Sequence, residues 1–82
     1  MTLIEFRLLS ESDQQEAIYK HGTYIGKRKH GRFPVLLYQL DSFYIEIYYI
    51  CYRKTIDHMY SFSSTALIDP YLPQINIEIL VS

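Results

Sequence analysis

Cysteine, glycine and proline are scarce in this sequence, and tryptophan is absent from it. The 82 residues include one cysteine, three glycines and three prolines. The single cysteine, Cys51, excludes a disulfide within the chain and leaves no second thiolate for a zinc site or a CxxC redox pair. The simplest setting for such a chain is a reducing compartment, so we expect a cytoplasmic protein.

Long apolar runs and an excess of charge are missing as well. No stretch approaches the roughly 18 uninterrupted apolar residues of a membrane span. The first ten residues carry Glu5 and Arg7 inside their apolar part and lack the basic start and cleavage site of a signal peptide. The formal net charge of −1 argues against a protein that binds nucleic acid with its whole surface. We expect no membrane partner, and any electrostatic function must come from a local cluster of charges.

The overall composition is that of a folded domain. Hydrophobic residues make up 49% of the chain and charged residues 21%, which excludes disorder. We expect one α+β domain over residues 1–82. A chain of this length buries only about 60% of the surface that its unfolded form exposes, so its stability should be marginal without a partner.

The first part of the chain carries helix signals. Thr2 and Glu5 have the spacing of a capping box in front of a short apolar segment. Ser10 can cap a second helix that Gly22 ends, which predicts a helix over residues 11–21.

From Thr23 onward the period of the apolar residues changes to two, which is typical of strands. The pattern predicts four strands joined by three tight turns, over residues 23–29, 32–40, 43–54 and 55–62, with the last turn near residues 53–54. The third run, FYIEIYYICYRK, has the strongest strand composition and is expected to be a central strand. Ser63 and the residues that follow can cap a short helix, whereas residues 75–82 fit either a strand or a helical turn.

The predicted fold class is therefore α+β: a four-stranded antiparallel β-meander, with an N-terminal helical segment and a short C-terminal helix packed on one face. Two-residue turns give a provisional register, with Leu40 opposite Phe43, Leu36 opposite Ile47, Ile47 opposite Tyr60 and Ile45 opposite Phe62. We name the two sides of the sheet the Phe43 face and the Tyr44 face. The register assigns Ile25, Ile56, His58, Tyr60 and Phe62 to the Phe43 face, and Tyr24, Asp57, Met59 and Ser61 to the Tyr44 face. A slip of one residue in a turn would exchange these assignments.

The Tyr44 face is rich in tyrosine, and the sequence has nine tyrosines in all. Tyrosine suits the core of an interface, because its ring is apolar and its hydroxyl tolerates water. If helices cover only the Phe43 face, a large apolar patch stays exposed. We therefore predict a non-enzymatic protein-interaction module, a homodimer through Val35, Leu37, Tyr44, Glu46, Tyr48, Ile50, Tyr52 and Met59. Two alternatives stay open: the chain's own terminal segments cover this face, or a ligand does.

A basic cluster gives a second hypothesis. In a meander the first and third turns lie at the same end of the sheet, which brings together Lys27, Arg28, Lys29, Arg32, Arg53 and Lys54, with His30 among them. Next to aromatic residues, such a cluster can bind nucleic acid or another polyanion by charge and stacking. Charged hairpin tips are also ordinary solubilising features that discourage aggregation.

Catalytic and metal-binding patterns are weak. Cys51 and His58 lie diagonally in the provisional register, but no residue is placed to orient the histidine and no element supplies an oxyanion hole. The histidines and carboxylates have no zinc-site spacing. We expect no enzymatic activity, no cofactor, no metal and no small-molecule substrate.

Two stretches carry a resemblance to other proteins. GTYIGKRKHGRFPVLLYQLDSFYIEIYY, and FSST followed by PYL, are similar to a group of short, uncharacterised bacterial proteins of about the same length. The resemblance covers residues 10–75 and implies a free-standing bacterial domain. It implies no activity, cofactor or site residue.

Overall fold

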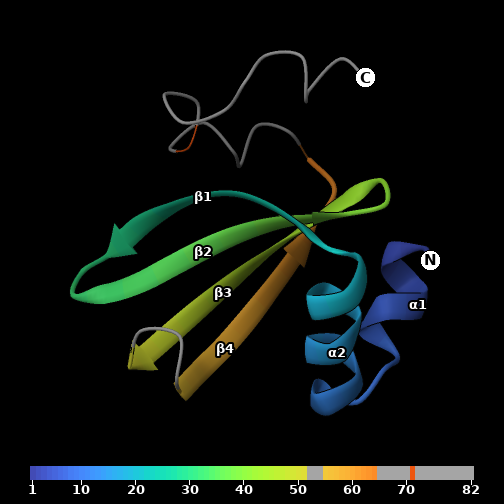
Figure 1. Ribbon diagram of the computed structural model, residues 1–82, viewed down its shortest axis with the longest axis horizontal. Coiled ribbons are helices and arrows are strands. Elements are labelled where there is room, and N and C mark those ends of the chain that lie inside the picture. Colours follow the sequence, from blue (N-terminus) through green and yellow to red (C-terminus); the bar gives the residue numbers. More distant parts are fainter. Residues whose placement is uncertain (52–54, 65–70, 72–82) are drawn as a thin grey trace.

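The computed structural model describes residues 1–51, 55–64 and 71, and it contains one antiparallel sheet with two helices (Figure 1). The helices are α1 (Leu3–Arg7) and α2 (Glu11–His21), and the strands are β1 (Thr23–His30), β2 (Phe33–Leu40), β3 (Phe43–Cys51) and β4 (Thr55–Phe62). The strand order is β1-β2-β3-β4. The predicted α+β meander with an N-terminal helical segment is confirmed. The predicted C-terminal helix lies almost wholly outside the described residues.

The caps of both helices agree with their sequence signals. The Thr2 hydroxyl accepts a hydrogen bond from the Glu5 amide at 3.1 Å, and the Thr2 amide donates to the Glu5 carboxylate at 2.8 Å. The Ser10 hydroxyl accepts from the Asp13 amide at 3.1 Å. Gly22 ends α2, and a Cβ atom there would lie 2.5 Å from the Ile18 carbonyl oxygen. A residue with a side chain would therefore force the end of α2 to shift.

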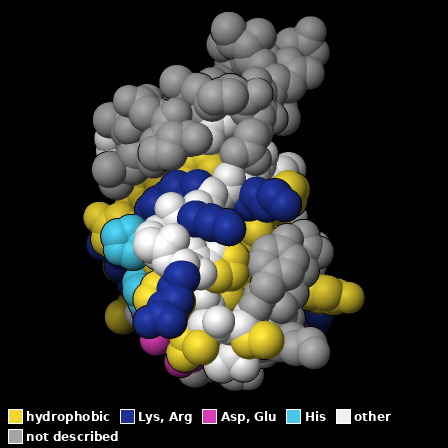
Figure 2. All heavy atoms as spheres, turned by 90° about the vertical axis from the view of Figure 1, so that its left-hand side faces the viewer, with side chains coloured by type: hydrophobic (Ala, Val, Ile, Leu, Met, Phe, Trp, Pro, Cys, Tyr) yellow, Lys and Arg dark blue, Asp and Glu magenta, His cyan; other side chains and the backbone are white. Residues whose placement is uncertain are grey.

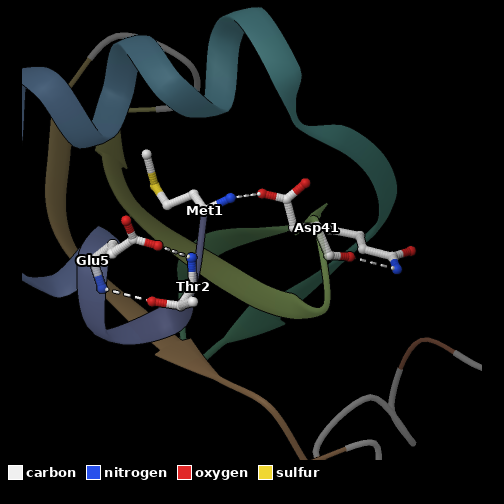
Figure 3. A network of polar contacts seen from close by, with 5 residues as sticks. Met1, Thr2, Glu5 and Asp41 are labelled. Carbon is white, nitrogen blue, oxygen red and sulfur yellow. Dashed lines mark hydrogen bonds and ion pairs between the residues drawn. The ribbon is translucent and has the colours of Figure 1, made fainter.

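The start of the chain is tied to the turn between β2 and β3 (Figure 3). The Met1 amino group donates to Asp41 Oδ2 at 2.7 Å, and Asp41 has a positive φ of 53°. Aspartate is one of the few residues that tolerate this left-handed conformation. The Asp41-Ser42 turn thus joins β2 to β3 and contacts the residue that precedes the N-cap of α1.

The β2–β3 pairing has the predicted register, whereas the β1–β2 and β3–β4 pairings do not. Leu40 faces Phe43 and Leu36 faces Ile47, as expected. Ile47, however, faces Met59 rather than Tyr60. Cys51 pairs with Thr55, so three residues instead of two separate the paired ends of β3 and β4. The first turn is also displaced by one residue, since His30 pairs with Phe33.

These shifts exchange several residues between the two faces. Phe62 now pairs with Tyr44, and His58 with Tyr48, so both lie on the Tyr44 face with Tyr60 between them. Met59 moves to the Phe43 face with Ser61, whereas Ile56 stays there because the ladder is irregular between Tyr48 and Tyr49. A second irregularity between Tyr24 and Gly26 puts Tyr24 on the Phe43 face and Ile25 on the Tyr44 face. The predicted faces of Ile25, Tyr24, His58, Tyr60, Phe62, Met59 and Ser61 were therefore wrong, because a bulge or a longer turn reverses the alternation.

Both faces of the sheet carry a cluster of buried side chains. On the Phe43 face, Phe6 of α1 and Ile18 of α2 pack with residues of β2 and β3, and the Phe6 and Phe43 rings lie 5.4 Å apart. On the Tyr44 face the cluster is Ile25, Leu37, Tyr44, Phe62 and Tyr71. Tyr71 comes from beyond β4 and is fully buried. The chain therefore covers part of the face that the helices leave open.

In the part of the chain that the structure describes, neither helix is long and apolar enough to cross a bilayer.

Candidate functional site

The centre of the Tyr44 face holds a buried carboxylate, Glu46, which is only 5% exposed. The Tyr71 hydroxyl donates to Glu46 Oε2 at 2.6 Å, and Arg28 Nε donates to the same oxygen at 2.9 Å. Arg28 Nη2 is also 2.9 Å from it. A carboxylate in an apolar environment is costly unless it is paired and hydrogen-bonded. Arg28 and Tyr71 meet both requirements.

The surroundings fix the protonation of these partners. Burial raises the pKa of the Tyr71 hydroxyl well above its ordinary value, and the hydrogen bond to Glu46 raises it further, so Tyr71 stays a hydrogen-bond donor. Burial lowers the pKa of Arg28, but the hydrogen bond and the negative charge of Glu46 outweigh burial and leave that pKa above its ordinary value. The network is thus a stable pairing of one anion, one cation and one neutral hydroxyl.

Arg28 extends this network to Tyr48. Its Nη2 atom donates to the Tyr48 hydroxyl at 2.9 Å, and its guanidinium carbon lies 5.7 Å from the centre of the Tyr48 ring. The His58 ring stacks on the Tyr48 ring at 4.2 Å, and the His30 ring meets it edge-on at 5.7 Å. His58 Nδ1 lies 2.7 Å from Asp57 Oδ2. One half-buried tyrosine therefore contacts a guanidinium group and two imidazole rings.

The basic end of the sheet includes the neighbours of this tyrosine on the Tyr44 face and two lysines, Lys27 and Lys29, on the Phe43 face. We use this name for Lys27, Arg28, Lys29, His30 and Arg32, together with His58. All of them except Arg28 are exposed, and Figure 2 shows lysine and arginine side chains gathered with histidines at the hairpin end of the molecule. Arg53 and Lys54, the other predicted members of the cluster, lie outside the described residues. The nearby carboxylates of Glu46 and Asp57 are each paired with a member of the basic end.

The placement of Arg28 changes its predicted role. It was expected to contact phosphate with the other cations, but its guanidinium is bound to Glu46 and Tyr48 and its side chain is only 23% exposed. Arg28 therefore positions the Tyr48 ring. Lys27, Lys29 and Arg32 keep their expected exposed positions.

The predicted dimer face is not one exposed surface. Val35, Leu37, Tyr44 and Glu46 are buried within the single chain, and Met59 packs on the opposite face. Tyr48 is half-buried, Ile50 is 57% exposed and Tyr52 lies outside the described residues. The expectation of a continuous exposed patch was wrong, because Tyr71 of the same chain covers its centre.

Cys51 and His58 do not meet. Cys51 is exposed at the end of β3, where it pairs with Thr55, whereas His58 stacks on Tyr48. Adjacent strand residues normally point to opposite faces, yet Asp57 contacts His58 because Asp57 is the unpaired residue of the irregular β3–β4 ladder. In the described part of the chain, no three histidine, cysteine or carboxylate side chains form a group that could hold a metal ion.

Sequence reasoning missed the Arg28–Glu46 pair and the role of Tyr71. One signal was present: a glutamate in the middle of an apolar strand requires a cation or a hydroxyl as its partner. The partners themselves depend on the register of the first hairpin and on a contact between residues 25 positions apart. Neither follows from the alternation of apolar and polar residues.

A scan against protein-family models, a search of curated proteins and a search of solved structures each find no match to this chain. The resemblance to short bacterial proteins therefore stays a prediction. The functional argument rests on the geometry of the site.

Proposed function

We propose that this protein is a non-enzymatic binding module that holds polyanions, above all single-stranded nucleic acid, at its basic end. The observation that carries the proposal is the hairpin end of β1 and β2. There exposed His30 contacts the Tyr48 ring on the Tyr44 face, exposed Lys29 lies at the same strand end on the Phe43 face, and exposed Arg32 lies in the turn. Glu46 is ion-paired with Arg28, so its negative charge is already balanced within the network.

Aromatic side chains favour nucleic acid over other polyanions. Phe33 is 39% exposed at the start of β2, and Tyr60 is 49% exposed on β4, two residues from His58. Bases stack on such rings without regard to sequence, while lysine and arginine attract the phosphates. The proposed mode of binding combines a positive hairpin end with rings along the neighbouring strand.

Homodimerisation through the Tyr44 face is the weaker candidate. Its predicted centre is buried in the single chain, and among the described residues Phe33, Ile50 and Tyr60 are large apolar side chains that stay exposed around it. A stable interface normally needs a buried apolar core on each partner. Bacterial origin and a cytoplasmic location remain predictions.

A binding titration tests the proposal. Fluorescence anisotropy of a labelled oligothymidine, recorded at several salt concentrations, should show binding that weakens as salt is raised. The double variant Lys29→Gln/Arg32→Gln should bind more weakly and reduce the slope of log K against log salt by about 1.4, since each lost phosphate contact removes about 0.7 for single strands.

Lys20→Gln is the matched control, because Lys20 is an exposed cation on α2, paired with Glu16 at 2.6 Å. It should leave binding unchanged. Equal affinity of the double variant and the native protein would overturn the proposal. Retention on heparin without any binding of oligothymidine would support the charge part of the proposal and contradict the nucleic-acid part.

A further inference from the structure

Two of the three histidines of the chain lie against the ring of Tyr48. The His58 ring stacks on it, with ring centres 4.2 Å apart and an interplanar angle of 16°, and the His30 ring meets it at 5.7 Å and 84°. His30 comes from β1 and His58 from β4, the two outer strands of the sheet, and both side chains are exposed. The Tyr48 ring thus brings two imidazoles together at the surface of the Tyr44 face.

His58 faces a carboxylate as well as the Tyr48 ring. Its Nδ1 atom lies 2.7 Å from Asp57 Oδ2, and the side chains of the pair are 55% and 48% exposed. A neutral imidazole leaves the charge of the carboxylate unbalanced, whereas an imidazolium forms an ion pair with it. Uptake of a proton by His58 therefore turns the pair from a net anion into a neutral pair.

His30 faces cations instead. It is the last residue of β1, directly after Lys29 and close in the chain to Arg32 of the turn. Among the described residues, its side chain contacts the Tyr48 ring and no carboxylate. Uptake of a proton by His30 therefore adds a positive charge at the hairpin end, where two exposed cations already lie.

The other charges around the Tyr48 ring belong to the Arg28–Glu46 pair. Arg28 carries a permanent positive charge, and its Nη2 atom lies 2.9 Å from Glu46 Oε2. Its guanidinium carbon lies 5.7 Å from the centre of the Tyr48 ring. Histidine is the side chain that ordinarily changes its charge between pH 5 and 8. In the described part of the basic end, the two imidazoles are therefore the groups whose charge responds to pH in this range.

We propose that His30 and His58 couple polyanion binding to proton uptake, so that nucleic acid binds more tightly as the two imidazoles become charged. This inference rests on the proposed function and adds its regulation. A charged His30 contacts phosphate, and a charged His58 removes the repulsion between Asp57 and phosphate. Both imidazolium rings stay in favourable contact with the Tyr48 ring. Because such coupling is reciprocal, bound nucleic acid in turn favours proton uptake.

Titrations with labelled oligothymidine near pH 8 and near pH 5.5, at the same ionic strength, test the coupling across the range in which histidine titrates. Thymine and the phosphodiester keep their charge over this range, so a change in affinity reports on the protein. Each imidazole should tighten binding about threefold, the effect of one exposed ionic contact, and the two together about tenfold. The slope of log K against log salt should steepen by about 0.7 for the new phosphate contact of His30.

Variants assign the effect to the two imidazoles. Each variant is judged by the ratio of its own affinities at the two pH values. His30→Gln and His58→Gln should each lower this ratio from about tenfold to about threefold, and the double variant should abolish it. His21→Gln is the matched control, because His21 is an exposed histidine at the end of α2, beyond the other end of β1. An undiminished ratio in the double variant, or an equal loss in His21→Gln, would overturn the proposal.

Asp57→Asn tests the part assigned to the His58 pair. It removes the carboxylate, so it should tighten binding near pH 8 about threefold. Asp13→Asn makes the same chemical change at an exposed residue of α2 and should leave binding unchanged. Unchanged affinity of Asp57→Asn would overturn the role of the pair.

Calorimetry separates a failure of this inference from a failure of the proposed function. Titration near pH 6.5 in two buffers of different ionisation enthalpy measures the protons taken up as oligothymidine binds. The native protein should take up protons, and the double histidine variant should take up none. Binding near pH 8 that does not strengthen near pH 5.5 would overturn the coupling alone. The absence of binding at both pH values would overturn the proposed function as well.

Discussion

The two faces of the sheet are covered by different chemistry. On the Phe43 face, helices α1 and α2 bring apolar side chains such as Phe6 and Ile18 onto the strands. On the Tyr44 face, the buried groups include a carboxylate held by Arg28 and by the hydroxyl of Tyr71. Apolar packing tolerates substitutions that conserve volume, whereas a buried ion pair fails when either partner is lost. A substitution that conserves volume should therefore cost little stability on the Phe43 face, but much on the Tyr44 face if it removes one partner of the ion pair.

The largest effect is expected on the Phe43 face when volume is lost. Phe6 is 1% exposed and contacts Phe43, so Phe6→Ala should lower the free energy of unfolding by about 4 kcal/mol. Phe6→Leu, which keeps most of the volume, should cost about 1 to 2 kcal/mol. Urea denaturation measures both. Ile4→Ala, on the exposed side of the same helix, is the control and should change stability by less than about 0.5 kcal/mol.

The next largest effect is expected when Glu46 loses its cation. Arg28→Met keeps much of the side-chain volume but leaves a buried carboxylate unpaired, at a cost of about 3 kcal/mol in unfolding free energy. Adding Glu46→Leu should recover part of that loss, because the unpaired charge is then gone while the buried Tyr71 hydroxyl loses its acceptor. If the double variant were as unstable as Arg28→Met alone, the Tyr44 face would not depend on charge pairing.

A smaller effect is expected from a single hydroxyl. Tyr71→Phe keeps the ring and removes the donor to Glu46, so it should cost about 1.5 kcal/mol, a typical value for a hydrogen bond to a charged group. Tyr19→Phe makes the same chemical change at a residue that is 90% exposed, and should be neutral. Thermal unfolding of the two variants side by side gives the comparison. Equal melting temperatures would argue that Tyr71 contributes only its ring.

The smallest effect, just above pH 10, is a dependence of stability on alkaline pH that Tyr71 of the Tyr44 face predicts. Burial raises the pKa of Tyr71 in the folded state. Its contribution to stability is therefore complete below the unfolded pKa of about 10 and falls as pH rises above it, by at most about 1.4 kcal/mol per pH unit. Tyr71→Phe should show a shallower loss of stability above this pH. Parallel curves of unfolding free energy against pH for the native protein and for Tyr71→Phe would contradict the raised pKa of Tyr71.

The sequence predicted the parts of the fold that depend on local chemistry. The Thr2–Glu5 capping box, the Ser10 cap and the Gly22 stop define both helices. The Asp41-Ser42 turn gave the correct register for the middle hairpin, because a two-residue turn leaves no freedom in the pairing.

The remaining errors have physical causes that the alternation of apolar and polar residues along a strand does not show. The spacing between Cys51 and Thr55 fits a turn of either length, and a difference of one residue moved Phe62 and Met59 to opposite faces. The displaced Tyr24 depends on a ladder irregularity in β1. Lys29, His30 and Arg32 are exposed at the end of the first hairpin, whereas the pairing of Arg28 with Glu46 depends on the three-dimensional register.

The central claim is that oligothymidine binds at the basic end. NMR mapping of amide chemical shifts tests it most directly, since one titration reports on both faces of the sheet and on the basic end. We predict shifts at Lys29, His30, Arg32 and His58 that saturate together and disappear at high salt. Amides of the buried residues Leu37 and Tyr44 should stay unchanged. Saturating shifts centred on Leu37 and Tyr44, or no shifts at low salt, would contradict the account.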